Sequence, residues 1–301
     1  MERSVRGLAK VDGVLRSDHE WIDNSGWDLN AGESLWLRSG LASKDSQKVP
    51  LLALLRVRNE ELILQDTLDH ISTFADYICV YEDASTDKTR EILKSCEKVV
   101  LILENNQWLS GIDNRLLSET RHRGLLLEVA RRHFEFQWCI CCDADERYIG
   151  PIREYVTDAL DLKPDAVRIS LFDAYMTPGD DAPYIPGDKL LNFRSFFGVE
   201  RRDILMLWQN HDRVKFFGLD AREPIVSGRT DVNFFCQHYG KSLSYEHWDA
   251  TCDYYSSNFP WVPYGEKWSK RKGHALHEKS DFGRELHKWS GALFENSIKI
   301  N

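Results

Sequence analysis

Residues 138–148 read WCICCDADERY, and in them an apolar run passes directly into three acidic side chains. A short, continuous apolar run is typical of a strand that is buried on both faces of a parallel sheet. Ligands of open α/β sheets bind at the carboxyl ends of the strands, which is where Asp143, Asp145 and Glu146 fall. The stretch therefore predicts a central strand with a candidate site at its end.

The same kind of apolar run recurs upstream, at residues 49–57 (VPLLALLRV), 77–81 (YICVY) and 99–103. Helical patterns lie between these runs. One helix is expected to begin at Asn59, a suitable N-cap, and another is expected over residues 117–133. Strands that alternate with helices imply a doubly wound, mainly parallel sheet flanked by helices, so the expected fold class is α/β.

The chain is expected to form one composite domain with three parts. Residues 1–48 show no sustained period but contain Trp, which predicts an irregular N-terminal extension packed on the core. Residues 49–150 hold the alternating pattern. In residues 151–301 the periodicity weakens into a mixed half, with short strands expected at 166–171, 204–208 and 231–237.

Charge and composition exclude several classes of protein. The 301 residues carry a formal net charge of -9, which disfavours a nucleic-acid binder, because phosphate neutralisation needs clustered cations. With no long apolar run and no signal-peptide pattern, we expect a cytoplasmic protein without a transmembrane segment. The basic stretch KWSKRK at residues 267–272 fits either a peripheral contact with a membrane surface or anionic ligand, or a solvated loop.

Three polar segments follow the predicted strands: RVRNEE at residues 56–61, EDASTDKT at 82–89 and DADE at 143–146. The alternate carboxylates of DADE can converge on a hard divalent cation, Mn²⁺ or Mg²⁺, or on a ribose hydroxyl. Such a cation stabilises the charge of a diphosphate leaving group. An isolated pair of this kind is more often a solvated acidic turn, so the other two segments decide its interpretation.

Taken together, LLALLRVRNEELILQDTLDH, ADYICVYEDASTDKTREIL and WCICCDADERY resemble, in order and spacing, the family 2 glycosyltransferases of the GT-A fold. The resemblance covers residues 49–150 and implies that this part binds a nucleotide-sugar, while residues 151–301 bind the acceptor. It implies an inverting, metal-dependent hexosyl- or deoxyhexosyltransferase that moves a sugar from a nucleotide-diphosphate donor, with UDP preferred, to a glycan hydroxyl.

The resemblance also implies roles for individual residues. Asp83 matches the acidic residue that reads the base, Asp145 matches a direct metal ligand, and Asp143 matches a contact to ribose or metal. Two departures, Glu82 for the usual Asp and Arg56 for the usual Pro, leave the base identity open. The residues implied to line the nucleotide pocket from the first turn are Arg56, Arg58 and Glu60.

One of two arginines on the helix before DADE is a candidate for a phosphate contact, and Arg121 is preferred over Arg123. An exposed helix face is the alternative. His238 resembles a late His that family members present to the metal or diphosphate, although a His at a strand end can simply bond a backbone group. Aromatic residues are dense from 239 to 268, which fits an acceptor subsite or core packing.

In LMLWQNHDRVKFFGLDAREPIV, Arg222 stands where the family has His, and Glu223 aligns with the family's acidic residue. An inverting transfer needs a carboxylate that takes the proton of the acceptor hydroxyl, so Glu223 is the first candidate base and Asp220 the second. Glu223 can equally be an ordinary loop residue before Pro224.

Two other classes of function stay open. A nucleotidyltransferase also uses an α/β sheet and carboxylate-bound magnesium, but its glycine-rich, basic first loop is missing here. A non-catalytic carbohydrate-binding or scaffold protein would keep the fold without turnover, against which the intact DADE carboxylates argue.

Overall fold

The computed structural model describes residues 21–23, 27, 29–38, 48–158, 163–259 and 263–300. Within them, ten strands follow one another across a single mixed sheet in the order β1-β2-β5-β4-β3-β6-β9-β8-β10-β7, and β11 and β12 both pair with β9. The strands are β1 (Trp21–Asp23), β2 (Glu33–Arg38), β3 (Val49–Val57), β4 (Tyr77–Asp83), β5 (Val99–Asn105), β6 (Phe136–Cys142), β7 (Glu146–Ile149), β8 (Ala166–Tyr175), β9 (Phe196–Gln209), β10 (Thr230–His238), β11 (Leu286–Lys288) and β12 (Ile298–Lys299).

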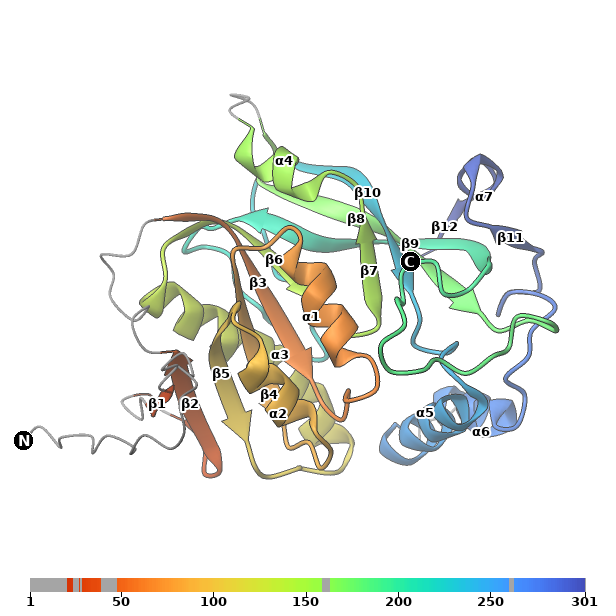
Figure 1. Cartoon of the computed structure of the whole chain (residues 1–301), viewed down its shortest axis with the longest axis horizontal. Helices are drawn as coiled ribbons and strands as arrows, with labels where there is room; N and C mark the ends of the chain where they lie inside the picture. The colour runs from red at the N-terminus through yellow and green to blue at the C-terminus, as the bar shows by residue number, and fades with distance from the viewer. Residues whose placement is uncertain are drawn as a thin grey trace, which may run out of the picture.

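Helices cover both faces of the central strands, as Figure 1 shows. The four strands β5, β4, β3 and β6 are parallel, so their carboxyl ends meet at one edge. The helices are α1 (Leu64–Ser72), α2 (Thr89–Ser95), α3 (Ile112–His133), α4 (Ile152–Thr157), α5 (Tyr245–Asn258), α6 (Tyr264–Arg271) and α7 (Gly291–Glu295). The α/β class with parallel core strands between helices is thereby confirmed.

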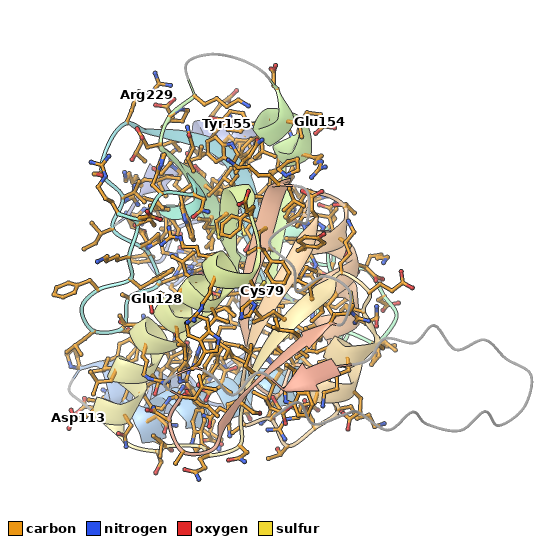
Figure 2. All side chains as sticks on the ribbon, turned by 90° about the vertical axis from the view of Figure 1, so that its left-hand side faces the viewer. Cys79, Asp113, Glu128, Glu154, Tyr155 and Arg229 are labelled. Carbon is orange, nitrogen blue, oxygen red and sulfur yellow. The ribbon has the colours of Figure 1, made fainter. Side chains whose placement is uncertain are left out.

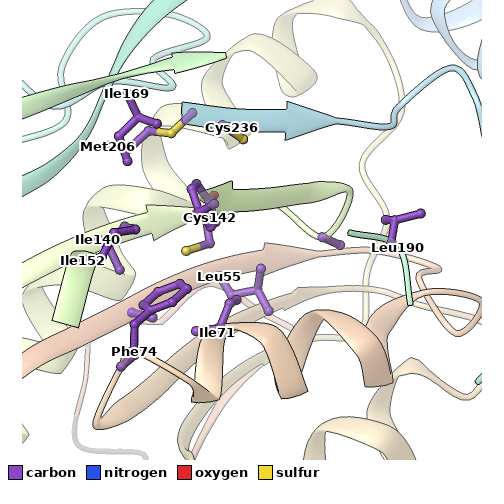
Figure 3. Packing of buried hydrophobic residues seen from close by; sticks show 14 of the residues in the cluster. Leu55, Ile71, Phe74, Ile140, Cys142, Ile152, Ile169, Leu190, Met206 and Cys236 are labelled. Atoms are coloured by element: carbon purple, nitrogen blue, oxygen red, sulfur yellow. The ribbon is translucent and has the colours of Figure 1, made fainter. Parts of the chain in front are cut away.

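Side-chain alternation along β3 explains the two layers. Leu51, Ala53 and Leu55 pack in the same core cluster as α1, whereas Leu52 and Leu54 pack with α3 on the other face. The first cluster continues past α1 to Cys142 of β6 and beyond, as Figure 3 shows. Because both faces of β3 are buried, its sequence reads as one unbroken apolar run.

The predicted strands of both halves are present in the structure, with β8 and β9 longer than expected. β2 is a strand that the sequence does not predict: it pairs antiparallel with β5 and extends the sheet on that side. The expected N-cap at Asn59 is wrong, because α1 begins at Leu64 after a turn and Asn59 takes a left-handed φ of 54°. Most of the extension 1–48 lies outside the described residues.

The mixed half attaches to the parallel half through β9, which pairs antiparallel with β6 and β8. β10 then lies between β8, to which it is parallel, and β7, to which it is antiparallel. This register sets His238, the last residue of β10, opposite both Glu146 and Asp173. The end of β10 is therefore held directly beside DADE.

A fully buried ion pair supports the turn after β6. The Arg147 side chain is 0% exposed and its Nη2 lies 2.8 Å from Oδ2 of Asp66 on α1. The same guanidinium donates from Nη1 to the carbonyl oxygen of Ala144 at 3.0 Å. Arg147 thereby ties the backbone of the DADE turn to α1.

We expect Arg147→Ala to lower the free energy of unfolding by about 3–5 kcal/mol, because the Asp66 carboxylate loses its buried partner. Arg153→Ala is the matched control: Arg153 pairs with Asp76 at 2.6 Å on the surface, where such pairs contribute about 0–1 kcal/mol. Urea-induced unfolding measures both variants. Equal losses for the two would contradict the role assigned to Arg147.

Candidate functional site

The site lies at the carboxyl edge of the parallel strands, where two polar turns are joined by hydrogen bonds. The backbone N–H groups of Asn59 and Glu60 donate to the hydroxyls of Ser85 (3.0 Å) and Thr89 (2.8 Å). Asn59 Oδ1 in turn accepts from the backbone of Thr86. Much of the polar character of RVRNEE and EDASTDKT therefore serves to fix the two turns against each other.

Asp83, at the end of β4, is 1% exposed and is surrounded by donors. Its Oδ2 accepts from Arg56 (2.8 Å) and Arg115 (3.1 Å), and its Oδ1 accepts from Asn105 (3.1 Å). Burial alone would raise the pKa of Asp83, but Arg56, His122 and Arg115 outweigh it and hold the pKa below its usual range. The carboxylate is thus ionised and fixed in place.

A pocket of about 210 Å³ opens beside Asp83, between the ends of β4 and β5, the start of β2 and the first turns of α3. In Figure 2, α3 rises from Asp113 near the lower edge of the molecule towards Glu128. Arg121 lines this pocket and pairs with Glu33 of β2, with Nη2 at 2.6 Å from Oε2. The preferred arginine of the sequence analysis thus lies on the Asp83 side of the site, and DADE is contacted by Arg123.

Asp143, the first residue of DADE, is bound by two arginines. Arg123 Nη2 lies 2.8 Å from Oδ1, and Arg222 Nη2 lies 3.3 Å from Oδ2. Arg222 also pairs with the buried Glu146. Although burial opposes ionisation, the two guanidinium groups hold the pKa of Asp143 far below its ordinary value.

Asp145 faces His238 across a narrow gap, with Oδ2 at 3.3 Å from Nε2. The other ring nitrogen, Nδ1, lies 2.6 Å from Asp173 Oδ1 at the end of β8. Burial alone would lower the pKa of His238, but the carboxylates of Asp145 and Asp173 outweigh it and raise the pKa to about 9. The backbone N–H of Tyr239 donates to the Asp145 carbonyl at 2.8 Å and fixes the pair.

This pair fits a hard divalent cation. Carboxylate and imidazole are suitable donors for Mn²⁺, and a second carboxylate on the far nitrogen is the usual partner of a metal-bound His. Gly240 leaves the space open: a Cβ there would come within 2.6 Å of Asp145 Oδ2 and 3.0 Å of His238 Nε2. Among the described residues, no group of three or more His, Cys, Asp or Glu side chains is placed to hold a metal ion.

The Glu60 carboxyl lies near the same two carboxylates. Its backbone is fixed by Thr89, and burial together with the charges of Asp145 and Asp143 raises the pKa of its carboxyl well above the ordinary value, so it retains its proton to a higher pH than an ordinary Glu. A bound cation would offset the charges of Asp143 and Asp145 that oppose the ionisation of Glu60. The charge distribution thus favours a cation beside Asp145.

The two candidate bases lie differently. Asp220 has a positive φ of 53° and its backbone N–H donates to Leu116 of α3. Partial burial raises the pKa of Asp220, and the charge of Glu119 adds to this effect. Glu223 instead pairs with Arg168 of β8 at 2.9 Å, and no contact joins it to DADE within the described residues.

The helices α5 and α6 lie beyond the end of β10, at the lower right in Figure 1. Their aromatic residues pack mainly on one another, as in the stacked pair Tyr255 and Trp268, with ring centroids 4.6 Å apart. Within KWSKRK, Arg271 pairs with Asp281 and Lys272 with Asp253. No helix in the described part of the chain has the length and apolar character needed to cross a membrane.

Several residues of the site are not singled out by the sequence analysis. Asp173 lies within β8, two residues beyond the strand that the sequence predicts at 166–171. The others approach from a helix and from the end of a strand, and only the folded chain brings them together. These residues are Asn105, Arg115 and Asp173.

Comparisons with known proteins give distant likenesses only. No protein-family model matches the chain, and no curated protein sequence matches it. Among solved structures, glucosyl-3-phosphoglycerate synthase from Mycobacterium tuberculosis, in complex with Mn²⁺, UDP and glucosyl-3-phosphoglycerate, is 17% identical, with a TM-score of 0.25. The match covers 45% of this chain and 47% of the synthase, about half of its length.

Two further matches cover more of the chain. A putative glucose-1-phosphate thymidylyltransferase from Bacillus anthracis is 12% identical over 75% of this chain and 85% of that one, with a TM-score of 0.28. HddC from Yersinia pseudotuberculosis is 10% identical over 68% of this chain and 99% of that one, with a TM-score of 0.31. These values describe a remote likeness in fold. They say nothing about the reaction of this chain, which has to be inferred from its own residues.

We expect Glu60→Gln to stabilise the protein by an amount that grows with pH. Above the ordinary pKa of 4.5 the unfolded chain releases the Glu60 proton while the folded chain retains it, so the free energy of unfolding falls as pH rises towards the raised pKa. The neutral amide removes this loss. Urea-induced unfolding with a chelator, at about pH 5 and about pH 8, measures the difference.

Glu91→Gln, on the exposed side of α2, is the control and should behave like the unaltered protein at both pH values. A gain from Glu60→Gln that is equal at both pH values would contradict a raised pKa of Glu60 in the folded chain.

Proposed function

We propose that this protein is a glycosyltransferase that moves a sugar from a nucleoside-diphosphate donor to a hydroxyl group of a glycan acceptor. The observation that carries the proposal is the placement of Asp83 and of the Asp145–His238 pair at the carboxyl edge, on either side of β3. A nucleotide-sugar that spans this edge would have its base at Asp83 and its diphosphate at DADE.

The pocket beside Asp83 supports a base with an acidic ring N–H. A fixed carboxylate accepts hydrogen bonds, and the neighbouring Arg115 supplies donors for carbonyl oxygens. Uracil, thymine and guanine combine a ring N–H with a flanking carbonyl, whereas adenine and cytosine do not. UDP is our first candidate within this group, on the resemblance of the sequence to family 2 glycosyltransferases.

Asp145 and His238 are the proposed cation ligands, and Asp143, held by Arg123 and Arg222, is proposed to contact ribose or a water of the cation. A bound Mn²⁺ or Mg²⁺ would supply positive charge to the diphosphate as it departs. Arg222, which contacts Asp143, is two residues from Asp220, the second candidate base of the sequence analysis.

Asp220 is the proposed base. As the acceptor oxygen forms its bond to the anomeric carbon, the bond from that carbon to the diphosphate oxygen breaks, and the electron pair leaves with the nucleoside diphosphate. The hydroxyl proton passes to the Asp220 carboxylate. A raised pKa suits this task, because it makes the carboxylate a better proton acceptor. Glu223, paired with Arg168, is the weaker candidate.

Calorimetric titration with UDP, GDP and dTDP, each with and without Mn²⁺, tests the donor site. We expect one nucleotide to bind only with the metal, and Asp145→Ala to weaken that binding at least about tenfold by removing a ligand. Asp113→Ala, on the exposed first turn of α3, should leave binding unchanged. Release of pyrophosphate in place of a nucleoside diphosphate during turnover would instead indicate a nucleotidyltransferase.

Exchange of each candidate base for its amide tests the acceptor chemistry. We expect Asp220→Asn to lower kcat by about 10²- to 10⁴-fold, the usual contribution of a general base, with little change in nucleotide affinity. Glu223→Gln should stay within about threefold of the unaltered enzyme, since its carboxylate is already paired with Arg168. Release of UDP in the presence of glycan acceptors measures both, and the reverse ranking would make Glu223 the base.

A further inference from the structure

The indole ring of Trp108 lies between two guanidinium groups, in the segment that joins β5 to α3. Cζ of Arg58 is 3.5 Å from the ring centroid, and Cζ of Arg115 is 3.8 Å from it. Two guanidinium carbons this close to one centroid would collide on the same face, so they occupy opposite faces. Trp108 is therefore the middle layer of a three-layer stack.

The two arginines carry donors that the protein does not use. The Nε atoms of Arg58 and Arg115 are both buried without a hydrogen-bond partner. Within the described residues, Arg58 makes no hydrogen bond or ion pair, and its main contact is the face of the indole. Buried donors without partners on two neighbouring cations, the buried Arg115 and the half-buried Arg58, are unfavourable unless an anion binds there.

The position of the stack shows which anion fits. In the strand order β5-β4-β3-β6, Arg58 follows the end of β3, between Asp83 after β4 and Asp143 after β6. A ligand that reaches from Asp83 to DADE must cross this point, and the indole covers it. Tyr254 of α5 approaches the same ring, with centroids 6.3 Å apart.

The segment that carries Trp108 can move without breaking the sheet. It ends at Gly111, which has a φ of 96° and no atom near its would-be Cβ, so the backbone can change conformation there with the loss of one hydrogen bond, from Asn114 of α3 to the Ser110 carbonyl. Gln107, one residue before Trp108, stays tied to Asn105 by a hydrogen bond of 3.0 Å. Rotation at residues 108–111 would therefore swing the indole out and leave the Asp83 pocket in place.

We infer that Arg58 and Arg115 form a diphosphate-binding pair and that Trp108 occupies the place between them until a nucleoside diphosphate displaces it. This inference rests on the proposed function, because it assigns the path of the donor across the site. Trp108 then acts as a competitor within the protein. While Trp108 occupies the place, the ligand cannot bind there. The apparent affinity for the ligand is therefore the intrinsic affinity multiplied by the fraction of molecules in which the place is open.

Calorimetric titration of the full-length chain with UDP, in the presence of Mn²⁺, tests the inference. We expect Trp108→Ala to bind UDP about tenfold more tightly than the unaltered protein, because the competitor is gone. Asp113→Ala, on the exposed first turn of α3 and outside the lining of the pocket, should bind like the unaltered protein. Weaker or unchanged binding by Trp108→Ala would overturn the inference, the former because the indole would then be stacking on the bound nucleotide.

Arg58→Gln separates a phosphate contact from a general loss of structure. We expect it to weaken UDP binding at least about tenfold while leaving the binding of uridine, which lacks phosphates, nearly unchanged. Equal weakening of UDP and uridine would overturn the role assigned to Arg58. Thermal unfolding of each variant shows whether it is folded.

Inorganic pyrophosphate distinguishes failure of this inference from failure of the proposed function. If no nucleotide binds but Trp108→Ala binds pyrophosphate more tightly than the unaltered protein, the proposed function fails and the arginine pair stands. If UDP binds and Trp108→Ala gains affinity for neither ligand, the inference alone fails. If neither UDP nor pyrophosphate binds to any variant, both fail.

Discussion

The backbone hydrogen bond from Tyr239 to the Asp145 carbonyl joins the two halves of the sheet where the proposed chemistry takes place. It exists because β10 lies between β7 and β8 in a register that ends at His238. A shift of one residue in that register would turn the imidazole to the other face of the sheet. The pairing of strands far apart in sequence therefore determines whether Asp145 has a partner.

Charge in the site is arranged as a chain of alternating carboxylates and cations. Asp173 and Asp145 flank His238, and Asp143 lies between Arg123 and Arg222. Such a network keeps each group ionised in a partly buried place, because every charge has an opposite neighbour within hydrogen-bond distance. Glu60 is repelled by Asp143 and Asp145, which marks the place where one more positive charge would be accommodated.

The sequence predicts the parallel half well, because a strand buried on both faces must be apolar throughout and polar residues must follow it. Asp83, Asp143 and Asp145 could be located in this way. The arginines that control these carboxylates could not: Arg115 and Arg222 approach from a helix and a loop, and their partners depend on tertiary packing. Asn59 shows the converse error, since its side chain fits an N-cap but bonds to the turn after β4.

β2 places a limit on how the chain can be divided into modules. Glu33 of β2 accepts hydrogen bonds from Tyr81 and Arg121, and so forms a wall of the pocket beside Asp83. A boundary drawn at residue 49, where the resemblance to glycosyltransferases begins, cuts through that wall and exposes the edge of β5. The smallest part of this chain that keeps the pocket beside Asp83 intact therefore includes the residues of β2.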